Sequence, residues 1–352
     1  MIDCTVLEEI YRETLDRCAP ERLIAKVWRD DFPRAVVAIG KCAGALRDGI
    51  DCDIDYDKAF VAIPHGYREP KKPSIVAFGT HPNYSEASFE AGRRLLEFVD
   101  RHDDITFIIS GGGSATVEVP IRESRRLNSV EENRRLIESG MTIGEINAHR
   151  KAMSAIKGGK LAARVRGRCV TLVYSDVSRG KLADVASGPT IPGSDEVILI
   201  ADNDTLTATA AEVARERGLR ATVLRDQIET DVETAAKQLA KAKFDDVLIA
   251  GGEVTVTVHG DGKGGRCSEL ALRYLLAGGS SPALLGSSDG MDGNSGAAGI
   301  VIDRVPDPLD RDAIATELAK SNSFPLAAEI GRAIMIPSAG NNLRDLYLLA
   351  RG

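Results

Sequence analysis

The sequence has few of the residues that build disulfide, zinc or histidine-based sites. Its 352 residues include six cysteines and only five histidines. The cysteines form no C-x-x-C pair, so neither a zinc motif nor a dithiol motif is indicated, and reduced thiols are the simplest expectation. No G-x-S-x-G segment surrounds Ser110 or Ser114. A Ser-His-Asp hydrolase of the nucleophile-elbow type is therefore disfavoured.

Long apolar runs and an excess of basic residues are absent too. No run approaches the roughly 18 apolar residues that span a bilayer. The N-terminal segment MIDCTVLEEIYRETLDRC lacks the basic and then apolar order of a secretory signal. A net charge of −7 disfavours a general nucleic-acid binder, which would carry a basic face. We expect a cytoplasmic protein that has a small-molecule substrate and no membrane or nucleic-acid partner.

Short apolar runs alternate with longer helical patterns in the first part of the chain. The runs are AVVAIG (35–40), AFVAIP (59–64), SIVAFG (74–79), ITFIIS (105–110), CVTLVYS (169–175) and VILIAD (197–202). Such alternation is typical of an α/β fold with a mainly parallel sheet covered by helices on both faces. Ligands of such sheets bind beyond the carboxyl ends of the strands.

The pattern changes after about residue 225. The segment EVTVTVHG (253–260) alternates strictly, which predicts a half-exposed, antiparallel strand. A length of 352 residues suggests about two domains. We therefore expect two α/β domains: a larger, three-layer, Rossmann-like domain over residues 1–235, and a smaller domain with a mixed sheet over residues 236–352.

Three consecutive glycines end the fourth apolar run, in IISGGGSA (108–115). Glycines at a strand end imply backbone conformations or close approaches that a Cβ would block. Bare N–H groups between two serine hydroxyls would form a concavity suited to phosphate oxygens. A tight turn without a ligand is the alternative. The candidate residues for cofactor binding are Ser110, Gly111, Gly112, Gly113 and Ser114.

Two lysines are candidates for meeting an anion. Lys41 follows the first apolar run and opens a helix, although Ala35 stands where a Walker A loop needs its first glycine. A surface cation near a helix start is the alternative for Lys41. Lys157 lies in IGEINAHRKAMSAIKGGKLA (143–162), which is either a cationic wall for phosphate and carboxylate groups or a solvated helix ended by Gly-Gly.

Carboxylate and amide side chains also follow predicted strands. Asp176 follows the run CVTLVYS, and Asp289 lies in the glycine-rich segment GSSDGMDGNSGAAG (286–299). Carboxylates in these places can bind Mg²⁺ or accept a hydroxyl proton, although Asp176 could instead cap a turn and the second segment could be a surface loop. Asn203 is either a helix N-cap or a ligand contact.

A second glycine motif, G-x-G-x-x-G at 260–265, precedes Arg266. The spacing formally matches a dinucleotide fingerprint, so an NAD(P)-dependent enzyme is an alternative. The preceding alternating strand and the cations of the loop favour a phosphoryl or carboxylate group, which arginine grips with two N–H groups. Glycine loops, cations and carboxylates at strand ends together fit phosphoryl transfer, which needs mainly positioning and charge neutralisation.

The chain resembles the class II glycerate kinases, the glycerate 2-kinases with a C-terminal MOFRL domain. The resemblance covers nearly everything after residue 35 and rests on segments in the family's order: GK (40–41), HP (81–82), SGGGSA (110–115), INAHRKAMSAIKGGKLA (146–162), SDV (175–177), SGPT (187–190), GGEVTVTVHGDGKGGR (251–266) and SSDGMDGNSGAAG (287–299). Departures occur at Cys267 and Ser268, in SRGKLADV (178–185) and in PSAGNNLRDL (337–346), and they concern acceptor choice and base contacts.

This resemblance implies ATP- and Mg²⁺-dependent phosphorylation of D-glycerate, or a similar 2-hydroxy acid, to 2-phosphoglycerate in a cleft between two domains. Lys41 and Arg266 would be the catalytic cations, and Ser110 to Ser114 the phosphate loop with Lys157 and Asn203 as further cofactor contacts. Asp176 and Asp289 would hold metal or accept the hydroxyl proton, without a distinction between them. The alternative activity is that of an NAD(P)-dependent hydroxypyruvate reductase, and a homodimer is a possible assembly.

Overall fold

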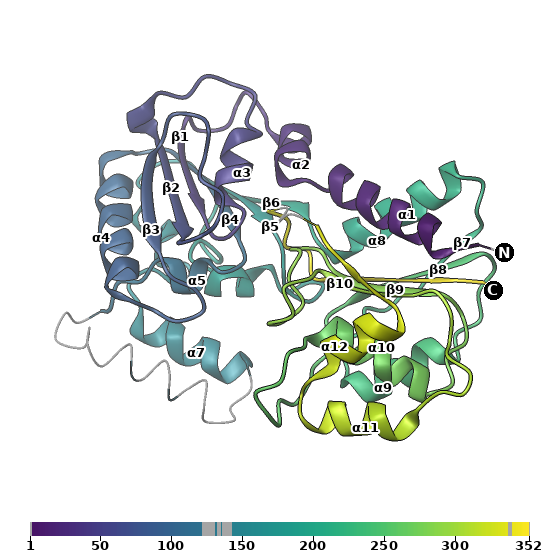
Figure 1. The fold of residues 1–352 in the computed structure, drawn as a ribbon. Helices are drawn as coiled ribbons and strands as arrows, with labels where there is room; N and C mark the ends of the chain where they lie inside the picture. Colours follow the sequence, from purple (N-terminus) through teal and green to yellow (C-terminus); the bar gives the residue numbers. More distant parts are fainter. Residues whose placement is uncertain (1, 122–130, 132–134, 136–142, 337–339, 352) are drawn as a thin grey trace. The chain divides into compact units, whose positions relative to one another are not determined.

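The computed structural model describes residues 2–121, 131, 135, 143–336 and 340–351. The chain divides into two compact units, coloured by sequence in Figure 1. The central unit is continuous, from Pro20 to Asp202, whereas the flanking unit combines Met1–Ala19 with Asn203–Gly352. This division differs from the one predicted at residue 235, because the first helix and residues 203–235 belong to the flanking unit.

The central unit contains a six-stranded sheet of order β3-β2-β1-β4-β5-β6 in which every pair is parallel. All six strands predicted from apolar runs are confirmed. Their bounds are β1 (Ala35–Ile39), β2 (Ala59–Pro64), β3 (Ile75–Gly79), β4 (Ile105–Ser110), β5 (Cys169–Tyr174) and β6 (Glu196–Ala201). Every residue of β1, β2, β4 and β5 is buried, as expected where helices cover both faces of a sheet, whereas the edge strand β6 exposes Val197 and Leu199.

Helices form the outer layers of the central unit (Figure 1). The helix α4 (Glu86–Arg101) packs on β2 and β3 with an apolar face that includes Leu95 and Phe98. The helices α2 (Pro20–Val27) and α3 (Ala43–Asp48) pack together, and α3 contacts β1, β2 and β4. The other helical segments described in this unit are η1 (Tyr56–Lys58), α5 (Gly113–Thr116), α7 (Ile143–Met153), η3 (Ala162–Arg164) and η4 (Leu182–Ser187).

The strand order reverses between β1 and β4, and this switch point brings two loops together. In sheets of this kind, the crevice beyond the strand ends at the switch point is the usual ligand site. The Lys41 backbone N–H, just after β1, donates a hydrogen bond of 2.9 Å to the Gly111 carbonyl, just after β4. The predicted phosphate loop and the predicted catalytic lysine therefore occupy one corner of the sheet.

The flanking unit contains a mixed sheet of order β11-β10-β9-β12-β8-β7, as predicted for the C-terminal part. Only the pair β7–β8 is parallel among the described pairs of this sheet. The bounds are β7 (Ala221–Val223), β8 (Val247–Gly252), β9 (Ala283–Ser287), β10 (Gly299–Ile302), β11 (Arg332–Ile334) and β12 (Asp345–Ala350).

Two groups of helices cover this second sheet. The helices α1 (Cys4–Arg17) and α8 (Asn203–Glu216) pack on each other, α8 contacts β8, and α1 contacts β9 and β12. The Tyr11 hydroxyl of α1 donates to the Ser287 carbonyl at 2.6 Å. The second group is α9 (Val232–Ala240), α10 (Arg266–Leu276), α11 (Arg311–Ala319) and α12 (Ser323–Ile330). Among the described residues, no helix is long and apolar enough to cross a membrane.

The alternating segment EVTVTVHG does not form the antiparallel strand that its pattern predicts. Within this segment the structure shows only an isolated parallel bridge, between Asp231 and Thr255. The alternation matches exposure only in part: Val254 is buried and Thr255 is exposed, but Val258, which is in phase with Val254, is 72% exposed. A period of two in the sequence therefore fixes neither the exposure of each side chain nor the presence of a neighbouring strand.

Candidate functional site

The two loops at the switch point of the central unit fit together through glycine. Gly40 has φ +115°, and a Cβ there would lie 2.4 Å from the Ser110 carbonyl oxygen. The Ser110 hydroxyl donates to the Ile39 carbonyl at 3.1 Å and accepts from the Cys42 N–H at 3.2 Å. Ser110 is fully buried, so its side chain joins the two loops and its predicted role as a direct phosphate ligand is not supported by this position.

Lys41 lies directly over the glycine loop. Gly112 has φ +80°, and a Cβ there would lie 2.8 Å from Lys41 Cγ and 3.2 Å from His81 Cδ2. The Lys41 side chain is half-buried, and its ammonium lies 5.9 Å from the centre of the Tyr67 ring. Within the described ranges, no carboxylate lies at ion-pair distance from it. The lysine is thus a cation available to an anion beside bare backbone.

His81 belongs to this corner, although the sequence argument gave it no role. Burial lowers the pKa of its imidazole to about 4, and the nearby charges of Lys41 and Arg150 act in the same direction. The ring is therefore neutral at pH 7 and can offer either a donor or an acceptor to a ligand. The signal in the sequence was the pair HP (81–82) directly after β3.

The remaining loop residues are held from the other side. A Cβ on Gly113 would lie 2.9 Å from Ala186 Cβ, and the Ser114 and Ser187 hydroxyl oxygens are 2.8 Å apart. Asp176 follows β5, the strand next to β4, and is half-buried at the same edge of the sheet. The structure therefore brings Lys41, the glycine loop and Asp176 to one edge of the central unit.

Lys157 does not join this group. The helix α7 ends at Met153, and the Lys157 ammonium is buried against the Glu118 carboxylate, with the Tyr84 hydroxyl at 2.9 Å. Burial alone lowers a lysine pKa, but Glu118 and Tyr84 raise the pKa of Lys157 above its ordinary value overall. The residue is a buried structural cation in this structure, which argues against the predicted contact with a cofactor.

We expect the variant Lys157→Met to lose stability much more than catalysis. It leaves Glu118 buried without its cation, which costs about 3–5 kcal/mol in unfolding free energy. Urea unfolding monitored by circular dichroism measures this loss. The double variant Lys157→Met/Glu118→Leu should recover much of it, since replacing both partners removes the unpaired charge. A normal midpoint for Lys157→Met with a large rise in the KM for MgATP would restore the predicted cofactor role.

In the flanking unit, Arg266 begins α10 and faces two acids. Its Nε and Nη2 donate to the two oxygens of Asp345 at 3.1 and 3.0 Å, and its Nη1 lies 2.7 Å from Glu253. Burial alone lowers the pKa of Arg266, but Asp345 and Glu253 raise it overall. If each of these contacts uses one hydrogen, two of the five guanidinium hydrogens have no partner among the described residues and can meet a ligand.

The two aspartates of the loop after β9 have different environments. Asp292 is buried, and its carboxylate accepts the backbone N–H groups of Cys267 and Ser268 at 2.8 and 2.9 Å. It therefore caps α10, and burial raises its pKa. Asp289 is half-buried and accepts from the Ser287 hydroxyl at 2.8 Å and from the Met291 N–H at 3.0 Å. Asp289 is the more accessible carboxylate.

The two departures from the family pattern after Arg266 point inward. The Cys267 side chain is fully buried, and burial raises its pKa well above the ordinary value, with Asp345 and Asp292 adding to the effect. The Ser268 hydroxyl donates to the Gly265 carbonyl and lies 3.0 Å from the Ser323 hydroxyl. Both residues therefore shape the start of α10. Part of the third departure, residues 337–339, lies outside the described residues.

Asn203 serves the flanking unit as a structural residue. It is buried at the start of α8, and its Nδ2 donates to the carbonyls of Leu343 and Asp345 at 2.7 and 3.0 Å. A Cβ on Gly251 would lie 2.1 Å from its Oδ1. These contacts tie α8 to the start of β12, so they do not support the predicted contact with a cofactor.

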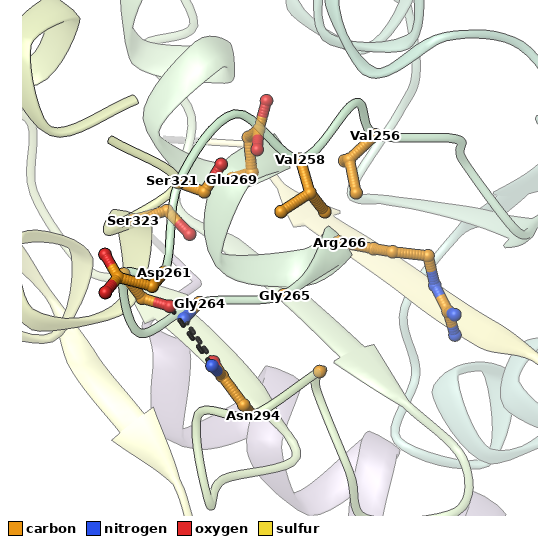
Figure 2. Close-up of a pocket in the computed structure, with 13 residues that line it drawn as sticks. Val256, Val258, Asp261, Gly264, Gly265, Arg266, Glu269, Asn294, Ser321 and Ser323 are labelled. Carbon is orange, nitrogen blue, oxygen red and sulfur yellow. Dashed lines mark hydrogen bonds between the residues drawn. The ribbon is translucent and has the colours of Figure 1, made fainter. Parts of the chain in front are cut away.

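The second glycine loop lines a pocket of about 350 Å³ in the flanking unit. Figure 2 shows Val256 and Val258 along one side, with the Arg266 guanidinium extending away from the loop. The lining residues are Val256, Val258, Gly260, Asp261, Gly262, Gly264, Gly265, Arg266, Glu269, Gly293, Asn294, Ser321 and Ser323. The pocket thus combines apolar walls with one arginine at its border.

Three N–H groups of this loop, those of residues 263–265, already have protein partners. Lys263 donates to Asn322 at 3.0 Å, Gly264 to Asn294 at 2.7 Å, and Gly265 to Ser268 at 2.9 Å, the second of which is drawn in Figure 2. The glycines allow close packing, since a Cβ on Gly262 would lie 2.6 Å from the Lys320 carbonyl oxygen. The second half of the G-x-G-x-x-G loop therefore does not offer its backbone donors to a dinucleotide.

The predicted site residues thus fall into two groups. The central unit holds Lys41, the glycine loop and Asp176, with His81 added by the structure. The flanking unit holds Arg266 and Asp289, with the acids Glu253 and Asp345 added. In the part of the chain that the structure describes, no three histidines, cysteines or acids come together as a preformed metal site. Mg²⁺ commonly binds through one or two carboxylates and substrate phosphates, which suits single aspartates such as Asp176 and Asp289.

Comparisons with known proteins match both parts of the chain. The Domain of unknown function (DUF4147) matches residues 6–218 and the MOFRL family matches residues 246–345, so the predicted boundary at residue 235 falls between the two matches. The glycerate 2-kinase of Sulfurisphaera tokodaii is 30% identical, over 90% of this chain and 89% of that protein. A protein of Agrobacterium vitis with a provisional hydroxypyruvate reductase name is 28% identical, over 90% of this chain and 87% of its own.

A solved structure supports the same relationship. The crystal structure of the glycerate kinase of Thermotoga maritima superimposes with a TM-score of 0.83 at 26% identity and covers 99% of each chain. The matching families, the sequence relatives and the fold agree over nearly the full length. The chain therefore belongs to the MOFRL family of glycerate 2-kinases.

Proposed function

We propose that the protein transfers the γ-phosphoryl group of ATP to the 2-hydroxyl of D-glycerate, giving 2-phosphoglycerate and ADP. The observation that carries the proposal is the corner of the central sheet, where Lys41 lies over Gly112 beside backbone without side chains. A cation and bare N–H groups at the switch point suit the phosphates of a nucleotide. The kinase names of the relatives support the acceptor.

We assign the donor to the central group and the carboxylate of the acceptor to Arg266. The Lys41 ammonium neutralises charge on the transferred phosphoryl group, and the two free N–H groups of Arg266 bind the glycerate carboxylate. One of Asp176 and Asp289 accepts the hydroxyl proton as the oxygen attacks phosphorus and the bond to ADP breaks. The other carboxylate would hold Mg²⁺, which when bound would offset the charge of the phosphate oxygens.

The alternative, a hydroxypyruvate reductase, is weaker on the structure. Its sequence argument depends on the loop at 260–265, and the N–H groups of Lys263, Gly264 and Gly265 bind the protein's own side chains. Hydride transfer from NAD(P)H would place the pyrophosphate on such donors. Because the Agrobacterium vitis relative carries a provisional hydroxypyruvate reductase name, the experiment also measures reductase activity.

The test measures ADP release from MgATP with and without D-glycerate, and then passes the product through enolase without a mutase. We expect release that depends on glycerate and a product that enolase consumes directly. ADP release with a product that enolase does not accept would mean that a hydroxyl other than the 2-hydroxyl is phosphorylated. No release, together with NADH oxidation by hydroxypyruvate, would replace the kinase by the reductase.

The state of the cysteines and the need for ATP bear on the cellular location of the protein. None of the six cysteines, all of which the structure describes, forms a disulfide, as expected for the reducing cytoplasm in which ATP is abundant. We therefore propose a cytoplasmic location. A homodimer remains a proposal that light scattering on the purified chain can test.

A further inference from the structure

A left-handed turn ends η4 in the central unit, beside the glycine loop. Ala186, Ser187 and Gly188 have consecutive φ values of 51°, 61° and 60°. Glycine adopts such values freely, but alanine and serine do so at a cost in free energy. Two strained residues in sequence persist only where the surrounding structure imposes them, and such strain gathers at functional sites.

The surrounding structure does impose this turn. The N–H of Gly158 donates to the Ser187 carbonyl at 3.1 Å, and the N–H of Gly159 donates to the Gly188 carbonyl at 2.7 Å. Gly158 and Gly159 are themselves left-handed, with φ of 66° and 81°. The segment after α7 and the turn therefore hold each other, and this accounts for the Gly-Gly pair, which does not end a helix.

The strained turn fixes the position of the Ser187 hydroxyl group. Ser187 is only 2% exposed, and its Oγ lies 2.8 Å from Ser114 Oγ and 3.4 Å from Asn147 Oδ1. An amide oxygen only accepts, so Ser187 donates to Asn147 and must accept the proton of Ser114. An anion that accepts a hydrogen bond from the Ser114 hydroxyl reverses the hydrogen bond between the two serines. Ser187 can then donate to Ser114 and give up its long hydrogen bond to Asn147.

We infer that Ser187 is a positioning residue, which the strained turn holds against Ser114 so that the Ser114 hydroxyl turns toward a phosphate oxygen of the donor. The inference rests on the proposed function of the glycine loop, but it concerns MgATP binding and does not depend on the identity of the acceptor. Ser187 itself need not touch the nucleotide. Its effect should appear through Ser114.

The test uses the full chain and the variants Ser187→Ala, Ser187→Gly, Ser114→Ala and Ser114→Ala/Ser187→Ala. MgATP binding is measured by calorimetry without acceptor, and KM values are measured for MgATP and D-glycerate. Both Ser187 variants should weaken MgATP binding about three- to tenfold, the effect of one neutral hydrogen bond, with the KM for D-glycerate unchanged. Ser187→Gly should keep or raise the Tm, since glycine relieves the strain.

The double variant decides whether Ser187 acts through Ser114. It should bind MgATP no more weakly than Ser114→Ala alone, whereas losses that multiply would overturn the inference. The control Ala186→Gly relaxes the neighbouring residue and keeps both hydroxyls, so it should bind MgATP normally. If Ala186→Gly weakened MgATP binding as much as Ser187→Ala, the shape of the turn would explain the effect, and the role of the Ser187 hydroxyl would be refuted.

Two further outcomes separate this inference from the proposed function. Normal MgATP binding by Ser187→Ala, or no MgATP binding by the wild-type chain, would overturn the role of Ser187. Wild-type binding that weakens in the Ser187 variants, without phosphorylation of D-glycerate, would support Ser187 and refute only the proposed acceptor.

Discussion

Replacing Lys41 by methionine should lower kcat for glycerate phosphorylation by roughly 10²- to 10³-fold, the loss typical of removing one preorganised group that stabilises transition-state charge. Methionine keeps the length of the side chain along Gly112, where Lys41 Cγ makes a close approach. The fold should therefore survive with an unchanged Tm. Steady-state kinetics of ADP release gives kcat, and the thermal midpoint gives the stability.

The matched control for this variant is Lys58→Met. Lys58 is an exposed lysine of the same unit, and its Nζ forms a surface ion pair with Asp55 Oδ2 at 3.0 Å. Exposed pairs of this kind contribute little, so the control should keep wild-type turnover. Equal rates for Lys41→Met and wild type would remove Lys41 from the reaction and leave it as a surface cation, the alternative that the sequence allowed.

Replacing Arg266 by alanine should reduce both turnover and stability. The two free N–H groups proposed to bind the acceptor disappear, which should cost roughly 10²- to 10³-fold in kcat/KM for glycerate. Asp345 is fully buried, so its carboxylate loses the guanidinium that faces it, at a cost of about 3–5 kcal/mol in unfolding free energy. Kinetics and urea unfolding measure the two effects separately.

Arg220 provides a control with the same pairing but greater exposure. Its Nε and Nη2 donate to the two oxygens of Asp246 at 3.0 and 2.9 Å, and its side chain is 66% exposed. Arg220→Ala should cost far less stability than Arg266→Ala and leave kinetics unchanged. Arg266→Lys should restore charge but not the fork geometry, so stability should recover more than activity. Full activity of Arg266→Ala would refute its assignment to the acceptor.

The strands of the central sheet could be predicted because their information is local. Each is an apolar run bounded by glycine, proline or charged residues, and all six lie in one parallel sheet. The division into units could not be predicted in the same way. The helix α1 is amphipathic, and the sequence does not reveal that its buried face, with Tyr11, packs on a sheet whose strands lie far along the chain.

The grouping of candidate residues could be predicted where two strand ends meet, but less well where a distant partner decides the environment of a side chain. The glycines at 111–113 and Lys41 meet because two strand ends meet. Lys157 carried the same sequence signal as a ligand-binding cation, but Glu118 lies 39 residues earlier in the chain and takes its ammonium into the core. The glycines of 260–265 likewise indicate a close approach, and the chain that approaches is the segment at residues 320–323.

Because the flanking unit is built from two separate parts of the chain, the two units complete their folding at different stages of translation. The central unit is a continuous stretch that ends at Asp202, so it can fold while the rest of the chain is still being translated. The flanking sheet cannot close until β12, which pairs with both β8 and β9, has been synthesised. Until then α1, which precedes the central unit in the chain, lacks the sheet on which it packs. Chains that end before β12 therefore leave the edges of β8 and β9 open to neighbouring polypeptides.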